Sequence, residues 1–501
     1  MLEIKDLSIL VDSKYLVKSL SLILQKNDKL AIIGEEGNGK STLLKAILGI
    51  CDYADFTGSI NFNGNRVGFL RQSLNNDDLS KRVFDYLFID MMDYYDKINS
   101  FYKYLEDLNL NDSILEQKIQ TLSGGEKVKI SILKILLDEV DIFFFDEPTN
   151  DLDIETLEWL EDFINKIDKP IIYVSHDEVL LSKTANMILH LEQIKNKSEC
   201  RHTLLRIDYD CYVEERLNSI NKQIQVARNE KREFDKKQAK LRQIMQKVEY
   251  QQNIISRRDP HGAKVLKKKM HSLKSQEKKL DNSNLTELPD VEESINFCFE
   301  DVLIPRNKVV LKLDNFVLEV ENRILSKNIN LEVIGNEHIC IIGKNGVGKS
   351  TLIKEIYNIL KNRCDIKVGY MPQNYDEILN DYEDVLDFVC DSKDKESLTK
   401  ARMYLGNMKF TKEEMMGKIS SLSMGTKAKL FLIKLVLEED NVLILDEPTR
   451  NVSPLSNPVI REVLNNFTGT IISVSHDRKY LDEVVDSLYN LDKDGLSKID
   501  L

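Results

Sequence analysis

The chain repeats itself, and this internal duplication constrains its fold more than any other feature. Four short motifs occur twice in the same order, with an offset of 309 residues for the first pair and 300 for the other three. The pairs are GEEGNGKST (34–42) and GKNGVGKST (343–351), LSGGEK (122–127) and LSMGTK (422–427), FFFDEPTN (143–150) and ILDEPTR (444–450), and YVSHDEVL (173–180) and SVSHDRKY (473–480). They predict two homologous domains, here called the first and second repeat, on either side of a central segment. We expect the three parts to span 1–212, 213–289 and 290–501.

Each repeat has the pattern of an α/β domain. The run KLAIIG (29–34) is typical of a buried strand that enters a Gly-rich turn, and STLLKAILG after it has helical spacing. Short apolar runs that end in polar or acidic residues, as central parallel strands do, follow in both repeats: DIFFFDEP, NVLILDEP, KPIIYVSHD and GTIISVSHD. The expected fold class is therefore α/β, with a parallel sheet in each repeat.

The central segment predicts an antiparallel helical hairpin. No Gly or Pro occurs from Tyr212 to about Lys247, which favours one long helix of about 50 Å. Asp259 is a good N-cap and Pro260 a good first residue for a second helix that ends near Leu280. The apex should lie near 248–258, and LTELPDVEES (285–294) is typical of a return linker.

Charge is distributed unevenly along the chain. The net charge is −13, yet residues 221–280 hold 18 Lys and Arg against 6 Asp and Glu, a local net of +12 that leaves −25 for the other 441 residues. A basic segment in an acidic chain suits a phosphate backbone, and its affinity should then fall with salt. A solvated, charge-rich hairpin is the alternative. The expected contacts are Lys236, Lys237, Lys240, Arg242, Lys264, Lys267, Lys268 and Lys269.

Composition favours a soluble cytoplasmic protein that has no contact with a membrane. Hydrophobic residues make up 42% and charged residues 31% of the chain, as in ordinary globular proteins. No apolar run approaches the roughly 18 to 20 residues that span a bilayer, and the N-terminus lacks a secretory pattern. The seven cysteines are scattered without a CxxC spacing, so we expect reduced thiols and no cysteine metal site.

Both repeats carry a GxxxxGKS loop between an expected strand and an expected helix. In that context the pattern predicts a phosphate-binding loop, whose backbone N–H groups and helix N-terminus hold phosphate. Lys40 and Lys349 should reach the β- and γ-phosphates, while Ser41 and Ser350 should bind Mg²⁺. The expected nucleotide-binding residues are Gly34, Glu35, Glu36, Gly37, Asn38, Gly39, Lys40, Ser41 and Thr42, with Gly343, Lys344, Asn345, Gly346, Val347, Gly348, Lys349, Ser350 and Thr351.

Two acids follow the next apolar strand in each repeat. Asp146 and Asp446 end their strands and can hold Mg²⁺ through its water shell. Glu147 and Glu447 come next and are candidates for polarising an attacking water. The alternative is that these acids only cap a helix N-terminus.

Two further polar pairs are in register between the repeats. His176 and His476 lie just beyond a strand, in SHD, and could sense the γ-phosphate, although a histidine is often purely structural. Gln72 and Gln373 follow short strands, in VGFLRQS and VGYMPQN, and could bind Mg²⁺ and watch the nucleophilic water.

LSGGE between a phosphate loop and DEPT resembles the signature of ATP-binding cassette (ABC) ATPases, over about 400 residues. The resemblance implies two P-loop NTPase domains in one monomer that close head to tail on two ATPs with Mg²⁺ and hydrolyse them. It implies a first site, in which Lys40 shares ATP with Ser423 and Gly425. It also implies a second site, in which Lys349 shares ATP with the signature residues Ser123, Gly124 and Gly125.

The two sites are not identical in sequence. The second signature has Met424 and Thr426 where the family pattern has Gly and Glu, which leaves the hydrolysis rate of the first site open. Tyr15, 25 residues before Lys40, could stack on adenine or simply pack in a strand, and Ile324 takes its place before Lys349. TRNVSPLS replaces TNDLDIET, so Asp153 has no counterpart in the second repeat.

The hairpin between the cassettes resembles the linker of ABC-F translation factors. That resemblance implies binding to the exit site of the bacterial 70S ribosome, with contacts to 23S rRNA and P-site tRNA. The interval from the glutamine to the signature serine is 51 residues in the first repeat and 50 in the second, so no arm is inserted there. With the long linker and TRNVSPLS, the chain resembles the antibiotic-resistance group of low-GC Gram-positive bacteria. A housekeeping ABC-F factor and the tandem ATPase of a transporter are the alternatives.

The resemblance suggests a mechanism as a hypothesis. ATP closes the cassettes, the hairpin tip displaces the acceptor end of the P-site tRNA and remodels the drug pocket, and hydrolysis resets the protein. The drugs implied are lincosamides, pleuromutilins and streptogramin A. Packing inside the hairpin turn is the alternative role for the tip. The tip residues expected are Tyr250, Gln251, Gln252, Asn253, Ile254, Ile255, Ser256, Arg257 and Arg258.

Overall fold

The computed structural model describes residues 1–11, 14–150, 152–194, 199–254, 260–281, 304–320, 323–390 and 394–499. Contacts between residues divide the chain into two units. Met1–Asp210 and Glu292–Leu501 form the first, and Cys211–Val291 form the second. The first unit contains both repeats, and the second contains most of the central segment.

A six-stranded sheet forms the centre of the first repeat, in the order β5-β6-β7-β3-β8-β9. All neighbours are parallel except β8 and β9. The strands β3, β6 and β7 are buried along their whole length, which explains their continuously apolar sequences. Their bounds are β3 Lys29–Gly34, β5 Val67–Leu70, β6 Ile142–Asp146, β7 Ile171–Val174, β8 Met187–Ile194 and β9 Glu199–Leu205.

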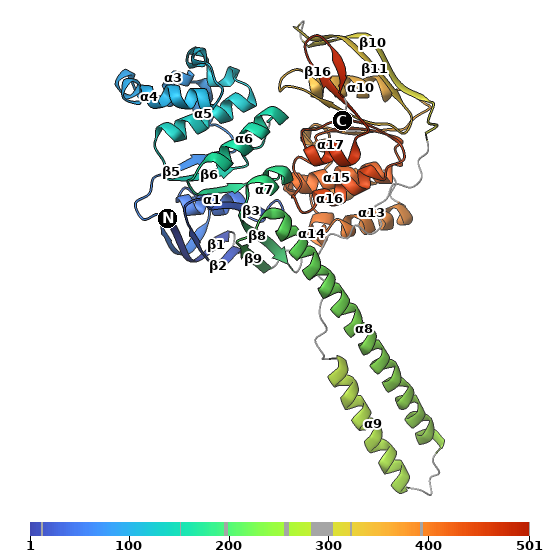
Figure 1. Cartoon of the computed structure of the whole chain (residues 1–501). Helices are drawn as coiled ribbons and strands as arrows, with labels where there is room; N and C mark the ends of the chain where they lie inside the picture. Colours follow the sequence, from blue (N-terminus) through green and yellow to red (C-terminus); the bar gives the residue numbers. More distant parts are fainter. Residues whose placement is uncertain are drawn as a thin grey trace. The chain divides into compact units, whose positions relative to one another are not determined.

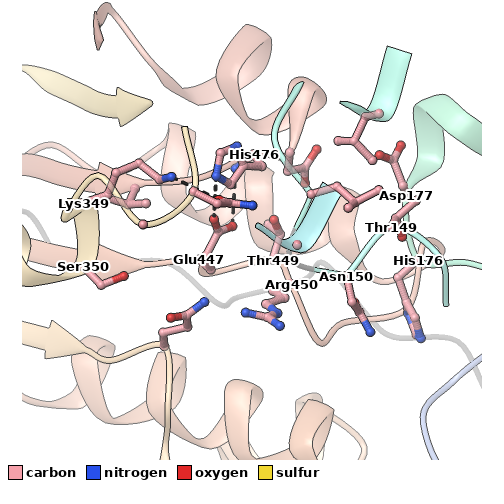
Figure 2. A pocket seen from close by; sticks show the side chains of 18 of the residues that line it. Thr149, Asn150, His176, Asp177, Lys349, Ser350, Glu447, Thr449, Arg450 and His476 are labelled. Carbon is pink, nitrogen blue, oxygen red and sulfur yellow. Dashed lines mark hydrogen bonds and ion pairs between the residues drawn. The ribbon is translucent and has the colours of Figure 1, made fainter. Parts of the chain in front are cut away.

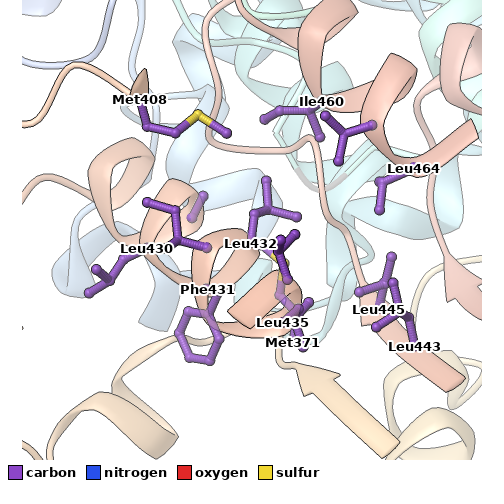
Figure 3. Close-up of a cluster of buried hydrophobic side chains, with 14 of the residues drawn as sticks. Met371, Met408, Leu430, Phe431, Leu432, Leu435, Leu443, Leu445, Ile460 and Leu464 are labelled. Atoms are coloured by element: carbon purple, nitrogen blue, oxygen red, sulfur yellow. The ribbon is translucent and has the colours of Figure 1, made fainter. Parts of the chain in front are cut away.

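The second repeat builds the same sheet, in the order β13-β14-β15-β12-β16-β17. Its largest core lies where the helix after the signature packs on the sheet; Figure 3 shows Phe431, Leu432 and Leu435 of that helix near Leu443 and Leu445 of β14. The α/β fold class predicted from the sequence is therefore confirmed. The strands are β12 His338–Ile342, β13 Val368–Met371, β14 Val442–Asp446, β15 Thr470–Val474, β16 Ser487–Leu491 and β17 Leu496–Ile499.

A smaller antiparallel sheet accompanies each parallel sheet. In the first repeat its order is β2-β1-β4, and in the second β10 pairs with β11. Their apolar faces share a core with β3 and α1 in the first repeat, and with β12 and α10 in the second. Their bounds are β1 Leu2–Val11, β2 Lys14–Leu24, β4 Asp55–Asn61, β10 Val309–Val320 and β11 Arg323–Ile334, with α1 Lys40–Leu48 and α10 Lys349–Leu360.

Helices complete both repeats in matching order (Figure 1). After β5 come α2 Asn76–Ser80, α3 Val83–Leu87, α4 Met91–Asp107 and α5 Gly124–Leu137, then α6 Ile154–Lys166 and α7 Glu178–Thr184. After β13 come α11 Asp376–Leu379, α12 Val385–Val389, α13 Lys395–Asn407, α14 Lys412–Met415 and α15 Met424–Leu437, then α16 Asn457–Asn465 and α17 Arg478–Val484. Short 3₁₀ turns at Asp112–Glu116, Ile119–Thr121 and Ile419–Ser421 precede the two signatures.

Two long helices make up the described part of the central segment. The helix α8 spans Tyr209–Ile254 and α9 spans Pro260–Asp281, and they run in opposite directions (Figure 1). The helical hairpin predicted from the sequence is confirmed. The first helix is longer than predicted, since 46 residues correspond to about 69 Å rather than 50 Å. It passes beyond Lys247 because the next seven residues contain no Gly or Pro.

The covered side chains of the hairpin follow a spacing of three and four residues, as in a coiled coil. Val248 is 2% exposed and Leu273 is 7% exposed, although their neighbours on either side are largely exposed. The hairpin is therefore held by a narrow apolar seam, which leaves its outer faces to charged residues. The covered positions include Phe234, Leu241, Met245 and Val248 on α8 and Leu266, Met270, Leu273 and Leu280 on α9.

The described ranges lack three kinds of feature. No helix there is both long and apolar enough to cross a bilayer. No group of three or more His, Cys, Asp or Glu side chains in these ranges could hold a metal ion. None of the cysteines that the structure describes is joined in a disulfide.

Candidate functional site: two nucleotide sites and a basic hairpin

The two phosphate loops have the same geometry. Lys40 Nζ donates to the carbonyl oxygens of Gly34 (2.9 Å) and Glu35 (3.1 Å), and Lys349 Nζ makes the equivalent bonds to Gly343 (2.8 Å) and Lys344 (3.1 Å). Burial lowers the pKa of both lysines. The backbone of each loop thus surrounds the ammonium group of its lysine. A phosphate chain can enter a loop that is arranged in this way. Gly34 is the last residue of β3, and every other residue of the two predicted loops lies between its strand and α1 or α10, or in the first turn of that helix.

A glycine is required just before each of these helices. The residue before α1 is Gly39, with φ at 85°, and the residue before α10 is Gly348, with φ at 105°. This left-handed backbone is unfavourable for residues with a Cβ atom. A Cβ on Gly39 would also lie 2.7 Å from Leu16, so the loop is packed directly against β2.

The serine after each lysine faces the acid at the end of the neighbouring strand. Ser41 Oγ donates to Asp146 Oδ1 at 2.7 Å. Burial raises the pKa of Asp446 to about 6, against the hydrogen bond from Ser350. Asp446 Oδ1 is buried and has no hydrogen-bond partner among the described residues. Hydroxyl and carboxylate oxygens are ligands that Mg²⁺ prefers, so this pair of residues fits that ion in both repeats.

Glu147 is surrounded by hydrogen-bond donors. Its Oε2 accepts from Gln72 Nε2 and from Asn150 Nδ2, both at 2.8 Å, and its Oε1 lies 3.4 Å from His176 Nε2. Burial alone would raise the pKa of Glu147, but His176, Asn150 and Lys40 outweigh it and lower the pKa to about 2. Its backbone has φ at 50°, a conformation that the packing around the strand end must hold. The carboxylate is fixed and ionised.

Glu447 has a different environment. Its Oε1 lies 3.9 Å from His476 Nε2, and its Oε2 accepts a 3.3 Å hydrogen bond from the His476 backbone N–H. Burial and the neighbouring Asp446 raise the pKa of Glu447 to about 7, although Arg450 acts in the opposite direction. The backbone φ of 56° matches that of the first repeat. The two equivalent glutamates thus differ in the direction of their pKa shifts: the pKa of Glu147 is lowered and that of Glu447 is raised.

A cavity of about 610 Å³ combines the second phosphate loop with residues of the first repeat. Figure 2 shows Lys349, Ser350 and Glu447 facing Asn150 and His176 across it. Its wall also includes Gly124 and Lys127 from the start of α5, so the second loop and one residue of the first signature line the same pocket. Gln373 lines the same cavity. The second site is therefore composite.

The first phosphate loop also meets the opposite signature. A small cavity of about 30 Å³ is lined by Glu35 and Glu36 of the loop together with Ser423 and Gly425 of the second signature, and Lys40 and Ser41 are not among its lining residues. The carboxylate of Glu36 accepts a hydrogen bond from the backbone N–H of Gly425. An acidic side chain thus takes the hydrogen bond of the Gly425 backbone N–H, although the resemblance assigns Gly425 to the ATP of the first site.

Each signature serine begins a helix. Ser123 Oγ accepts from the backbone N–H of Glu126 at the start of α5, and the Glu126 carboxylate accepts from the backbone N–H of Ser123 at 2.8 Å, which forms a capping box. Ser423 caps α15, and its hydroxyl pairs with that of Thr426 at 2.9 Å. Thr426 replaces the glutamate in the second signature, so α15 has no capping box. The hydroxyl group of Ser423 is nevertheless retained.

Several residues at these sites have no conspicuous sequence signal. Asn150 bonds Glu147, and Arg450 stands at the equivalent position in the second site. Tyr53 is 60% exposed, and its hydroxyl lies 3.2 Å from Thr42 Oγ1 beside the first loop. Tyr15, in contrast, is indicated by the sequence; it lies on β2 and is 47% exposed. Aligning the two repeats position by position is the signal that could have revealed the exchange of Asn150 for Arg450.

Asp153 has a local structural role. It caps α6 by accepting from the backbone N–H of Thr156 at 3.0 Å. The second repeat lacks this cap, and α16 has 9 residues where α6 has 13. His176 Nδ1 lies 2.9 Å from the carbonyl oxygen of Val452, in the segment TRNVSPLS that replaces the capped one.

The basic residues expected to contact a polyanion all lie on exposed positions of the hairpin. Lys236, Lys237, Lys240 and Arg242 are exposed on α8, as are Lys264, Lys267, Lys268 and Lys269 on α9. Tyr250, Gln251, Gln252, Asn253 and Ile254 form the last turns of α8. The remaining predicted tip residues, Ile255, Ser256, Arg257 and Arg258, and the linker at 285–294 lie outside the described residues.

Comparisons with known proteins agree with this geometry. The family model described as ABC transporter matches residues 17–150 and 326–450. The ATP-binding protein Uup of Buchnera aphidicola is 27% identical over 99% of this chain and 81% of its own length. The ABC transporter F family member 5 of Arabidopsis thaliana is 27% identical over 95% of this chain and 72% of its own. A chain in the crystal structure of archaeal ribosomal stalk protein aP1 with the archaeal ribosome recycling factor aABCE1 superposes with a TM-score of 0.60 at 17% identity, over 98% of this chain and 90% of that one, which shows a shared fold.

Proposed function

The chain belongs to the ABC transporter family as an ABC-F-type ATPase with two cassettes, and from this premise we propose that it is a cytoplasmic ribosome-protection protein. It binds the exit site of the bacterial 70S ribosome when ATP closes the repeats. The hairpin tip then lies near the peptidyl-transferase centre, displaces the P-site tRNA end and dislodges lincosamide, pleuromutilin or streptogramin A drugs. Hydrolysis releases the protein.

The observation that carries the proposal is the charge of the hairpin. Its seam is apolar, its outer faces hold the exposed lysines and arginines, and its sixty central residues have a net charge of +12 in a chain of −13. Such charge is costly for a coiled coil that stays in water, because like charges repel along both helices. A phosphate backbone relieves that repulsion, and 23S rRNA or tRNA offers one.

The end of α8 adds a second argument. Tyr250 is 68% exposed and Ile254 is 61% exposed, and they are the two most exposed large apolar side chains among the described residues of the hairpin. Aromatic side chains at such tips can stack on nucleotide bases, and an exposed isoleucine is favourable only where it meets a partner. Both features suit insertion of the tip into an RNA-lined pocket.

The residues of the two sites couple this binding to ATP. Lys40 and Lys349 hold the β- and γ-phosphates, and Ser41 and Ser350 with Asp146 and Asp446 hold Mg²⁺. When bound, Mg²⁺ neutralises charge on the transferred phosphoryl group. Glu147 and Glu447 orient and deprotonate the attacking water, while His176 and His476 hold these carboxylates and contact the γ-phosphate. Gln72, which bonds Glu147, and Gln373, which lines the second cavity, would contact the metal and the water.

A general translation role is the second candidate. A housekeeping ABC-F factor would use the same sites and hairpin to adjust the peptidyl-tRNA, without a drug in the pocket.

A pelleting experiment tests ribosome binding. The double variant Glu147→Gln with Glu447→Gln should bind ATP and hydrolyse it slowly, and should co-sediment with 70S ribosomes in ATP but not in ADP. The matched control, Lys40→Ala with Lys349→Ala, should not co-sediment in either nucleotide. Absence of ATP-dependent pelleting by a variant that binds ATP would overturn the proposal and favour a transporter ATPase.

A charge experiment tests the hairpin. Replacing Lys264, Lys267, Lys268 and Lys269 by glutamine should weaken ribosome binding and lower its salt dependence by about one unit of slope for each phosphate that is no longer neutralised. The ATPase rate without ribosomes should stay unchanged. An unchanged salt dependence would mean that the basic face is only solvated.

Drug susceptibility separates the two ABC-F roles. Ile254→Ala should lower protection of expressing cells without changing ATP hydrolysis, whereas Val226→Ala, an exposed apolar residue far from the tip on α8, should change neither. Expression that protects against none of the three drug classes would favour the general translation role.

A further inference from the structure

Buried charged residues connect the two repeats beside the second nucleotide site, whose cavity is lined by Asp177 and Asp477. Arg461 of α16 makes a two-pronged contact with Glu178 of α7, with Nη1–Oε1 at 2.6 Å and Nη2–Oε2 at 3.2 Å. Their side chains are only 2% and 5% exposed. Lys479 lies 3.2 Å from the same carboxylate. The contact spans 283 residues of sequence, so it joins the repeats directly.

A second contact of the same kind lies beside the first. Arg478 of α17 donates to Glu161 of α6, whose side chain is 4% exposed, and lies 3.4 Å from Asp177. The helices α7 and α17 that carry Glu178 and Arg478 pack on each other. We call Glu161, Glu178, Arg461 and Arg478 the charge quartet.

The quartet is built on the duplication, with the charges reversed. Position 161 corresponds to 461 and position 178 to 478, at the offset of 300 residues that relates the later motifs. The first repeat thus has two glutamates where the second has two arginines. A third position is reversed as well: Lys183 pairs with Glu161 inside the first repeat at 2.8 Å, and Glu483 pairs with Arg461 inside the second at 2.7 Å.

This reversal has a consequence for pairing between like repeats. In a symmetric interface, residue i of one partner meets residue j of the other, and j meets i. Two first repeats would therefore bring Glu161 against Glu178 twice, and two second repeats would bring Arg461 against Arg478 twice. Like charges forced together in a buried contact are strongly unfavourable. Only a first repeat with a second repeat satisfies all four side chains.

We propose that the charge quartet makes cassette pairing selective, so that the surface formed by α6 and α7 accepts an interface with two arginines and rejects another copy of itself. The natural partner is the second repeat of the same chain. The quartet thus directs the chain to close on itself and opposes ATP-driven assembly of two chains through like repeats. The inference is independent of the ribosome, because it concerns how the repeats find each other.

Charge reversal at one position tests the selectivity. Glu178→Arg puts two arginines together in the natural pair. It also makes the first repeat complementary to its own copy, because Glu161 of each copy would then face the introduced arginine of the other. In the background Glu147→Gln with Glu447→Gln, which retains ATP, this full-length variant should form an ATP-dependent dimer in sedimentation at about 50 µM. The wild-type quartet in that background should stay monomeric.

The neutral variant Glu178→Gln is the matched control. It removes the same carboxylate and weakens the natural pair, but it offers no attraction between two first repeats, so it should remain monomeric. In chains with both catalytic glutamates intact, Glu178→Arg should lower ATP turnover at least tenfold and Glu178→Gln less. Circular dichroism and thermal melting establish that each variant is folded.

A second reversal provides an independent test. Arg461→Glu makes the second repeat complementary to its own copy and should also dimerise in ATP, whereas Arg461→Gln should not. Dimers in both reversals and in neither neutral variant would support the proposal. Reversals that stay monomeric like the neutral variants, or dimers that form equally with the neutral variants, would overturn it, as would turnover within twofold of wild type in both reversals.

Discussion

Glu147 and Glu447 occupy the same place in the two repeats, each at a strand end with a left-handed backbone, yet their surroundings differ. At Glu147, His176, Gln72 and Asn150 surround the carboxylate and its pKa falls to about 2. At Glu447 burial dominates and the pKa rises to about 7. The contacts with the opposite signature differ too: Glu36 of the first loop bonds the backbone of Gly425, whereas the second loop and the start of α5 line a cavity of about 610 Å³.

The duplication has kept the chemical groups in place while the contacts around them diverged. The first site has a tightly held, weakly basic glutamate, an acidic loop residue against the opposite signature, and a signature without its capping glutamate. The second site has an open pocket, a complete signature and a glutamate that can exchange a proton near neutral pH. We therefore expect the second site to carry most of the hydrolysis and the first site to serve mainly in binding.

Turnover should respond most strongly to changes in this pair of glutamates. Glu447→Gln should lower the steady-state rate of phosphate release between about a hundredfold and a thousandfold, because it removes a base whose pKa matches the working pH. Glu147→Gln should lower it only a few-fold. Both variants should still bind ATP, which fluorescence titration checks. Equal losses of turnover in the two variants would contradict the asymmetry between the sites.

The motifs made the chemistry of both sites predictable, since each is a short contiguous pattern with a local geometry. Gly39 and Gly348 are needed for the left-handed residue before a helix, and Asp146 and Asp446 follow strands that the apolar runs already indicate. The hairpin was predictable for the same reason. Its first helix was underestimated because the polar residues after Lys247 carry little helical signal, while packing of Val248 extends the seam.

The asymmetry was only partly predictable. The changes in the second signature and at Tyr15 are visible in the sequence, but the contact of Glu36 with Gly425 spans 389 residues and depends on how the repeats meet. The opposite pKa shifts of the two glutamates depend on burial and on donors from several elements. The quartet needed both the offset of the duplication and the observed pairing to be recognised.

A buried carboxyl group distinguishes the two repeats in stability. Asp440 is 5% exposed, its Oδ2 has no hydrogen-bond partner among the described residues, and Val140 takes its place in the first repeat. Burial raises the pKa of Asp440 to about 7. The folded state therefore keeps a proton that the unfolded state loses above about pH 4, and stability falls as pH rises from about 4 to 7.

Asp440→Val should remove this pH-dependent destabilisation. We expect the free energy of unfolding to rise by roughly 2 to 3 kcal/mol at pH 8 and by less at pH 5, measured by urea denaturation. Val140→Asp should have the opposite effect in the first repeat. A gain from Asp440→Val that is the same at both pH values would show that packing alone, and not the proton, distinguishes the two positions.

The acidic loop residue should have a moderate effect on affinity. Glu36→Gln should strengthen ATP binding at the first site about tenfold, because a carboxylate near phosphate is repulsive and competes for the Gly425 amide. The measurement is calorimetric titration in a Lys349→Ala background, where only the first site binds. Asn345→Ala, at the equivalent position of the second loop, should leave first-site binding unchanged. An unchanged affinity in Glu36→Gln would mean that the loop releases the amide without cost.

The smallest difference that we expect between the two sites concerns the recognition of adenine. Tyr15 is 47% exposed on β2, and Ile324, at the equivalent place on β11, is 46% exposed, so a ring and an aliphatic chain are equally accessible at the two sites. Stacking by a half-exposed ring lies at the weak end of the usual range, so Tyr15→Ala should weaken ATP binding at the first site about fivefold. Ile324→Ala should leave second-site binding unchanged. If Tyr15→Ala instead lowers the melting temperature and leaves affinity intact, Tyr15 packs in its strand and the sites recognise adenine alike.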